Sequence, residues 1–184
     1  YVIVSGMARG VDGEAHGAAM ETGTVAAIAG GIDQIYPPQH EQLYGILAQR
    51  GCLVSESPFG YVAQARDFPK RNRVISGLSL ATIVVEAADR SGSLITARFA
   101  LEQGREVMAV PGSPLDPRAR GANRLLKQGA ALIESAEDVL HEMEGIAPPT
   151  FDEPFADRFD ARDADVPPAL LRAVREALSP TPMR

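Results

Sequence analysis

The chain of 184 residues has no tryptophan, a single cysteine and few aromatic residues. One cysteine, Cys52, excludes an internal disulfide and a zinc site built from cysteines. No apolar run approaches the roughly 18–20 residues that a membrane-spanning helix needs, and no signal peptide is visible. We therefore expect a cytoplasmic protein. The apolar content of 45% is still enough for a sizeable core.

Basic residues are also outnumbered, because the formal net charge is −6. Their distribution along the chain is uneven. Residues 61–130 carry 11 basic and six acidic side chains, whereas residues 141–184 carry nine acidic and five basic ones. Local charge decides whether a surface can neutralise phosphates, so the segment 61–130 is a candidate polyanion-binding region. A solvated face with clustered charges is the alternative.

Apolar β-branched runs alternate with helical patterns along most of the chain. This alternation predicts an α/β fold with a mostly parallel sheet covered by helices on both faces. We expect this domain over residues 1–145, then an acidic, proline-containing linker over 146–168 and a helical segment over 169–184. The expected strands are 1–5, 24–29, 52–56, 81–87, 106–110 and 130–133, and the expected helices are 12–22, 39–49, 69–78, 93–103, 122–128 and 136–144.

Ligands of such sheets bind beyond the carboxyl ends of the strands, where three strand-to-helix loops stand out. The first is SGMARGVD at residues 5–12. Its two glycines let the backbone approach a ligand while amide groups point outward, so Ser5, Gly6 and Arg9 are candidate contacts. The spacing is not the dinucleotide fingerprint, and the lysine of a P-loop is missing. The alternative is a tight turn that needs glycine and nothing more.

The second loop, RDFPKRNRVISGL at residues 66–78, carries the most specific signal. Pro69 suits the first turn of a helix and places cations, an asparagine and an aromatic ring near its start. Such a set resembles a phosphate clamp with a stacking platform, formed by Arg66, Phe68, Lys70, Arg71, Asn72 and Arg73. Helical spacing also puts Lys70 on the face of Val74 and Arg71 on the face of Ile75, so we expect some of these cations to be partly buried. The alternative is surface cations that pair with Asp67, Glu56 or Glu86.

The third loop contains Ser91-Gly92-Ser93, which offers hydroxyls and free amides at the mouth of another helix. A plain helix cap explains Ser91 or Ser93 equally well. No nucleophile–base–acid set, carboxylate pair or metal cluster can be assembled, and the three histidines lack metal-ligand spacing. We therefore expect no catalytic residue, no cofactor and no metal.

Five blocks resemble successive motifs of the DNA-processing protein A family, also called DprA or Smf. They are SGMARGVDGEAH, GGIDQIYPPQH, FPKRNRVISGLS, VVEAADRSGSLITARFALEQGREVMAVPG and GANRLLKQGA, within residues 1–140. The resemblance implies a doubly wound, Rossmann-like domain that binds single-stranded DNA, forms a homodimer and loads the recombinase RecA in natural transformation. It maps the basic pocket of the family to residues 66–73, with Phe68 as the base-stacking residue.

The resemblance also implies parts outside this domain and contacts within it. The first strand of the family's domain and its G-S-R loop would precede Tyr1, and a winged-helix module would begin near 169–178. RecA and dimer contacts would lie at about 123–139. Two other functions are open: a nucleotide hydrolase of the lysine-decarboxylase-like type and a scaffold that binds RecA but little DNA. The hydrolase signature needs an acid three residues after Thr96, where this chain has Phe99.

Overall fold

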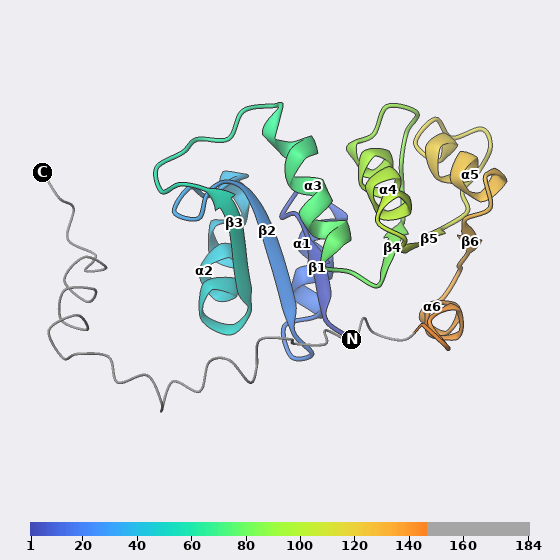
Figure 1. Cartoon of the computed structure of the whole chain (residues 1–184), viewed down its shortest axis with the longest axis horizontal. Helices are drawn as coiled ribbons and strands as arrows, with labels where there is room; N and C mark the ends of the chain where they lie inside the picture. The colour runs from blue at the N-terminus through green and yellow to red at the C-terminus, as the bar shows by residue number, and fades with distance from the viewer. Residues whose placement is uncertain (147–184) are drawn as a thin grey trace, which may run out of the picture. The chain divides into compact units, whose positions relative to one another are not determined.

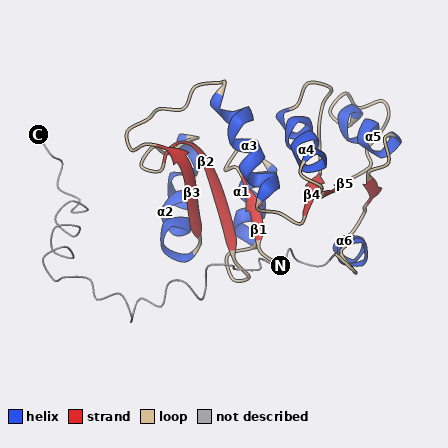
Figure 2. Ribbon diagram, in the orientation of Figure 1, coloured by secondary structure: helices blue, strands red, loops and turns tan. Residues whose placement is uncertain are grey.

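The computed structural model describes residues 1–146, and these contain two parallel sheets of three strands each (Figures 1 and 2). The first sheet has the order β1 (Ile3–Ser5), β2 (Thr24–Gly31) and β3 (Cys52–Ser57). The second has the order β4 (Ala81–Val84), β5 (Glu106–Ala109) and β6 (Ala131–Leu132). The predicted α/β class with parallel strands is confirmed. The hydrogen bonding nevertheless divides the strands between two sheets, because β1 and β4 do not pair.

Helices connect consecutive strands, as parallel pairing requires. They are α1 (Val11–Ala18), α2 (Glu41–Arg50), α3 (Asp67–Gly77), α4 (Gly92–Glu102) and α5 (Arg120–Lys127), and a short 3-10 turn (Pro38–His40) precedes α2. The last described helix, α6 (Ala136–Glu142), starts with a capping box between Ser135 and Asp138. No described helix is long and apolar enough to cross a membrane. The expected linker and final helix lie outside the described residues.

The alternation of side chains along β2 decides which helices cover the first sheet. Ala26 and Ile28 are buried in a cluster with Tyr44 and Leu47 of α2. Ala27 and Ala29 point to the opposite face, because successive strand residues alternate, and they line a pocket beside α3. Helices therefore lie on both faces of this sheet, as the sequence predicts.

Small residues allow α3 and α4 to approach each other closely. Ser76 of α3 and Ala97 and Ala100 of α4 are completely buried. The Ser76 hydroxyl donates a hydrogen bond to Gln103 Oε1 at 2.6 Å, and Gln103 Nε2 donates to the carbonyl of Arg73 at 2.9 Å. Polar contacts thus fix the distance between α3, which follows the first sheet, and α4, which follows β4.

Candidate nucleic-acid interface

The three loops singled out in the sequence meet at the carboxyl ends of the strands. Arg71 of α3 donates a hydrogen bond from Nη1 to the carbonyl of Gly6 at 2.8 Å. Asn72 donates from Nδ2 to the carbonyl of Gly92 at 3.3 Å. One turn of α3 therefore connects the first predicted loop with the third. The three loops therefore lie together, but the roles of the individual residues differ from those expected.

The turn at residues 5–10 is closed by a carboxylate of its own chain. Asp12 Oδ2 accepts hydrogen bonds from the amides of Gly6 at 3.1 Å and Ala8 at 2.9 Å, and Met7 between them is buried with φ of 61°. The expectation that these two amides face a ligand is therefore wrong, because Asp12 already supplies the negative charge. Arg9, in contrast, is exposed at the tip of the turn.

Gly6 is required by the close approach of a side chain. A Cβ atom at this position would lie 2.8 Å from Arg71 Cζ, which is shorter than any ordinary contact. Ser5 ends β1 and is half-buried beside this turn. The glycine therefore makes room for a guanidinium group of the same chain rather than for a ligand.

Arg71 is turned inward onto backbone carbonyls. Its Nη1 donates to the carbonyls of Gly6 and Ala27, and its Nε donates to Asn72 Oδ1 at 3.3 Å. Burial lowers the pKa of Arg71, and the charge of Asp12 opposes that shift. The predicted role of Arg71 as an open phosphate clamp is corrected: it connects β2, α3 and the turn that follows β1.

Two cations of α3 have carboxylate partners. Arg73 Nη2 lies 2.7 Å from both oxygens of Glu56, and Lys70 Nζ lies 3.8 Å from Asp67 Oδ1. The alternative that cations pair with Glu56 and Asp67 is correct for these two residues. The contacts differ in strength, because the Lys70 pair is long and its side chain is 71% exposed. Lys70 can therefore exchange Asp67 for a phosphate more easily than Arg73 can exchange Glu56.

Asp67 is also held by neighbours other than Lys70. Its Oδ2 accepts a hydrogen bond from the hydroxyl of Tyr61 at 2.7 Å and from the amide of Gln64 at 2.9 Å. Both hydrogen bonds lower the pKa of Asp67, and the one from the amide of Gln64 has the larger effect. Because they would remain if Lys70 moved away, they favour the exchange of Lys70 to an external anion. Arg66, next to Asp67, is exposed.

Phe68 lies between another aromatic ring and a cation. Its ring centroid is 5.2 Å from that of Tyr36, with a tilt of 53°, and 5.8 Å from Arg71 Cζ. Phe68 is half-buried, whereas Tyr36 is 55% exposed. Tyr36 was not predicted, because it lies 32 positions away in the sequence. An aromatic residue soon after the carboxyl end of β2, beside two prolines, is the only sequence signal that pointed to it.

The ring pair is positioned by a loop that is anchored to the end of β2. Gly31 donates its amide to the carbonyl of Tyr61 at 2.8 Å, and Gly60 donates to both oxygens of Asp33, at 2.8 and 3.0 Å. A Cβ atom at Gly31 would lie 2.5 Å from the carbonyl oxygen of Pro58. The glycine of this position therefore brings the loop before α3 against β2.

The remaining predicted contacts have structural partners. Asn72 is buried and bridges Arg71 and Gly92, as described above. Ser91 caps α4, because its Oγ accepts a hydrogen bond from the amide of Ser93 at 3.3 Å. The same hydroxyl donates a hydrogen bond to Ser93 Oγ, also at 3.3 Å. The plain-cap alternative therefore describes this loop. Gly92 is exposed at the start of α4.

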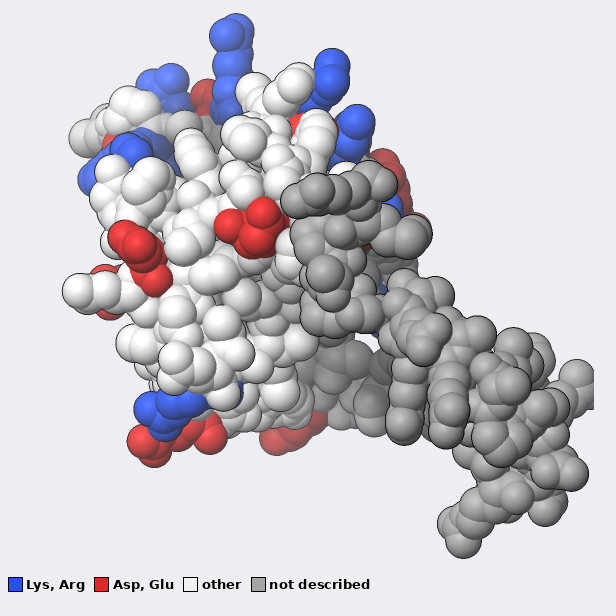
Figure 3. Space-filling model, turned by 90° about the vertical axis from the view of Figure 1, so that its left-hand side faces the viewer, with Lys and Arg blue, Asp and Glu red and all other residues white. Residues whose placement is uncertain are grey.

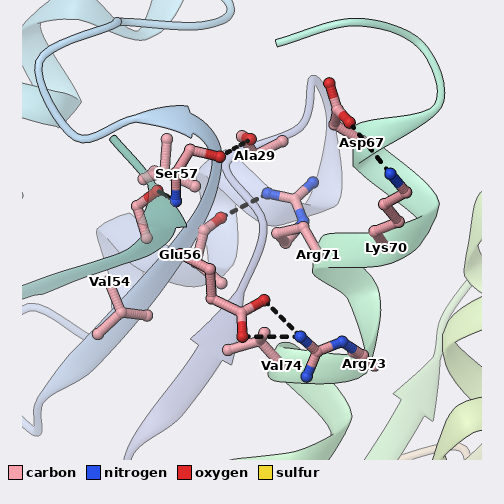
Figure 4. Close-up of a pocket in the computed structure, with 12 residues that line it drawn as sticks. Ala29, Val54, Glu56, Ser57, Asp67, Lys70, Arg71, Arg73 and Val74 are labelled. Carbon is pink, nitrogen blue, oxygen red and sulfur yellow. Dashed lines mark hydrogen bonds and ion pairs between the residues drawn. The ribbon is translucent and has the colours of Figure 1, made fainter. Parts of the chain in front are cut away.

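A pocket of about 340 Å³ lies between α3 and the carboxyl ends of β2 and β3 (Figure 4). Ala27, Ala29 and Val54 form its apolar part, and Arg71 and the Arg73–Glu56 pair form its polar part. Figure 4 shows the side chains of Lys70, Arg71 and Arg73 arranged along α3, each directed to a different partner. The candidate interface thus combines this pocket with the three cations of α3, Lys70, Arg71 and Arg73.

The family model for DNA recombination-mediator protein A matches residues 1–144, most of the chain. The chain belongs to this family. DNA processing protein DprA of Bacillus subtilis is 51% identical over 145 residues, which are 78% of this chain and 49% of the relative. Protein Smf of Escherichia coli is 49% identical over 145 residues, 77% of this chain and 39% of the relative. The chain therefore spans about half or less of the length of these DprA and Smf relatives.

Solved DprA structures share the fold. DprA from Streptococcus pneumoniae is similar with a TM-score of 0.72 and 43% identity, over 77% of this chain and 50% of that one. DNA processing protein A from Helicobacter pylori, whose structure concerns a single-stranded DNA binding mode, gives a TM-score of 0.70 and 31% identity. That match covers 78% of this chain and 66% of the other.

The charge distribution of this DprA-family domain follows the edge that the loops form. Figure 3 shows Lys and Arg side chains projecting along the upper edge, where α3 begins in Figure 1. Within residues 1–146 no group of three or more His, Cys, Asp or Glu side chains is placed to hold a metal ion. His16 is instead a core residue, whose Nδ1 lies 2.7 Å from Thr24 Oγ1 and whose pKa is lowered by burial.

Proposed function

We propose that this domain binds single-stranded DNA at the carboxyl ends of its strands, through an interface formed by Arg9, Tyr36, Arg66, Phe68 and Lys70. One observation carries the proposal: an exposed aromatic ring, Tyr36, is backed by Phe68, which in turn contacts the Arg71 guanidinium. Such a ring offers a flat face to a base, and stacking on it is worth about 1–3 kcal/mol per base with little dependence on sequence.

The exposed cations around the ring pair complement a phosphate backbone. Arg9, Arg66 and Lys70 are all exposed, and the only acid within ion-pair distance of any of them in residues 1–146 is Asp67. Neutralised phosphates release counterions, so binding should weaken as salt is added. A duplex hides its base faces, so the ring pair gives selectivity for single strands.

The mode differs from a phosphate site made of helix-start amides. Asp12 accepts the hydrogen bonds of the amides of Gly6 and Ala8, and Ser91 accepts that of the amide of Ser93 at the start of α4. These amides are therefore not available to a phosphate. The single-stranded DNA binding mode described for the Helicobacter pylori relative supports the ligand class. The contacts proposed here come from side chains of this chain.

The absence of tryptophan provides a direct test of stacking. In a Tyr36→Trp variant the single indole should be strongly quenched when oligo-dT is added, because the base stacks on it. Tyr1→Trp is the matched control, since Tyr1 is 72% exposed and precedes β1 at the opposite edge of the sheet. Equal quenching in both variants, or none in Tyr36→Trp under conditions where DNA binds, would contradict the stacking role.

We further propose that the protein acts without catalysing a reaction, as a homodimer that protects incoming DNA and loads RecA during transformation and recombination. Family membership supports this role. Light scattering tests the dimer, and RecA filament formation on DNA coated with single-strand-binding protein tests loading. The hydrolase alternative needs an acid at position 99, where this chain has Phe99 in contact with Arg98. No residue in the described part of the chain favours the hydrolase.

A further inference from the structure

A second group of arginines lies at the carboxyl ends of β4 and β5. It occupies the loop 85–91, between β4 and α4, and the segment 110–124, which joins β5 to α5 and includes the first turns of that helix. The two segments are in direct contact: the amide of Gly121 donates to the carbonyl of Ala87 at 2.7 Å, and Arg124 Nη1 lies 3.2 Å from Asp89 Oδ1. We call them together the α4–α5 rim.

The rim is continuous with the proposed interface on α3. Asn72, one turn after Phe68, donates its hydrogen bond to the carbonyl of Gly92, which directly follows the loop 85–91. Gly121 in turn has no space for a side chain, since a Cβ atom would lie 2.7 Å from the carbonyl oxygen of Ala87. The starts of α3, α4 and α5 therefore form one edge at fixed spacing.

The cations of the rim divide into paired and free ones. Arg118 pairs with Asp116 at 2.9 Å and reaches Glu86 at 4.0 Å, and Arg124 pairs with Asp89. These contacts use all three carboxylates of the rim. Arg90 and Arg120 are exposed, and within residues 1–146 neither has an acid at ion-pair distance.

Arg120 also stands at an unfavourable place for a cation. It is the first residue of α5, where the helix dipole is positive. An external anion beside Arg120 would remove this repulsion. The same anion would be close to the loop that carries Arg90, because Gly121 and Ala87 are hydrogen-bonded.

An apolar side chain lies at the tip of the rim. Leu115 is 89% exposed although its loop is well tied: its amide donates to Ser113 Oγ at 3.3 Å, and Asn123 exchanges two hydrogen bonds with Gly112, at 2.9 and 3.1 Å. An ordered loop of the rim therefore presents a leucine to solvent. Free cations and an exposed apolar side chain on the same rim complement a strand with charged phosphates and uncovered bases.

We propose that the α4–α5 rim binds the continuation of the same single strand of DNA that the Tyr36–Phe68 pair holds, with Arg90 and Arg120 on phosphates and Leu115 against a base or sugar. This inference rests on the proposed function and extends its footprint along the edge. For comparison, a single OB fold covers roughly 4–16 nucleotides of a single strand. A short oligonucleotide therefore occupies the ring pair alone, whereas a longer one also reaches the rim.

The test compares two oligonucleotide lengths on the full chain, by fluorescence anisotropy at several salt concentrations. The Arg90→Gln/Arg120→Gln variant should bind oligo-dT of roughly 5 nucleotides as well as the unchanged chain does. For roughly 20 nucleotides it should lose about tenfold in affinity, and the salt slope should fall by about 1.4, since each contact to a single strand contributes about 0.7. Leu115→Ser should weaken only the long complex and leave the slope unchanged.

The matched control is Arg50→Gln/Lys127→Gln. These two exposed cations end α2 and α5, at the opposite edge of the sheets, so the control removes the same charge. Equal losses for both lengths, or a control that behaves like the rim variant, would overturn the rim. An unchanged affinity for the long strand would do so as well. Failure of the unchanged chain to bind either length would instead overturn the proposed function itself.

Discussion

Two strand-to-helix turns at the same edge of the first sheet have opposite characters. The turn at residues 5–10 is closed by Asp12, which accepts the amides of Gly6 and Ala8. The start of α3 leaves side chains available to a ligand. Phe68 packs against the exposed ring of Tyr36, and Lys70 has only a long contact to Asp67. The amides of a glycine-rich turn are thus available to an external anion only if no carboxylate of the same chain already accepts their hydrogen bonds.

Arg71 connects the two turns, so the largest effect is expected from its removal. Arg71→Met takes away the donor to the carbonyls of Gly6 and Ala27 and leaves both unpaired. Each unpaired buried group costs about 1–3 kcal/mol, so the free energy of unfolding should fall by about 2–6 kcal/mol. Urea denaturation measures this loss. A variant as stable as the unchanged chain would show that Arg71 is not a structural residue.

Asp12→Ala tests the closed turn by opening it. The amides of Gly6 and Ala8 lose their acceptor, so stability should fall by about 1–3 kcal/mol. DNA affinity should be retained or increase, because a carboxylate is removed and two amides become available to a phosphate. Parallel denaturation and anisotropy titrations separate the two effects. A large loss of DNA affinity in a folded variant would show that the turn already takes part in binding.

Arg66→Gln/Lys70→Gln tests the open turn. Both side chains are exposed and are expected to contact phosphates, so DNA affinity should fall by about tenfold at low salt and the salt slope by about 1.4. Stability should hardly change, since the Lys70–Asp67 pair is exposed and long. An unchanged slope would remove these two residues from the interface.

The smallest effect is expected from Glu56→Gln. The change removes the charge that holds Arg73, whose Nη2 contacts both oxygens of Glu56 in a pair that is about half exposed, so stability should change little. The freed guanidinium can then meet a phosphate, and DNA affinity should rise by about two- to fivefold at low salt. A titration at low and at high salt checks the sign, because the gain should disappear at high salt. A loss of affinity would mean that the Glu56–Arg73 pair itself supports the interface.

The fold was predictable because its signals are local. Apolar runs such as the one around Ala26 and Ile28 mark buried strands, and the alternation of strands and helices predicts parallel pairing. Helical spacing indicated that Lys70, Arg71 or both are partly buried, and the structure partly buries Arg71 but leaves Lys70 exposed. The predicted elements agree with the structure in type and order.

The roles of the site residues depend on partners that are distant in the sequence. Whether a cation is free is decided by an acid elsewhere: Glu56 on β3 pairs with Arg73, whereas Arg66, just before α3, has no acid at ion-pair distance within residues 1–146. Tyr36 contacts Phe68 only because the chain folds the loop after β2 against the first turn of α3. Composition and spacing give the set of candidates, and tertiary contacts decide among them.

Gly31 gives the binding face an unexpected point of control. Tyr36 follows β2 and Phe68 lies in the first turn of α3, and the amide of Gly31 joins the loop after β2 to the loop before α3 through its hydrogen bond to Tyr61. Adding even a methyl group there would push the two loops apart and leave all proposed contact residues unchanged in identity. An inactive protein could therefore arise from a residue that never touches DNA, and sequence comparison of the contact residues alone would not reveal it.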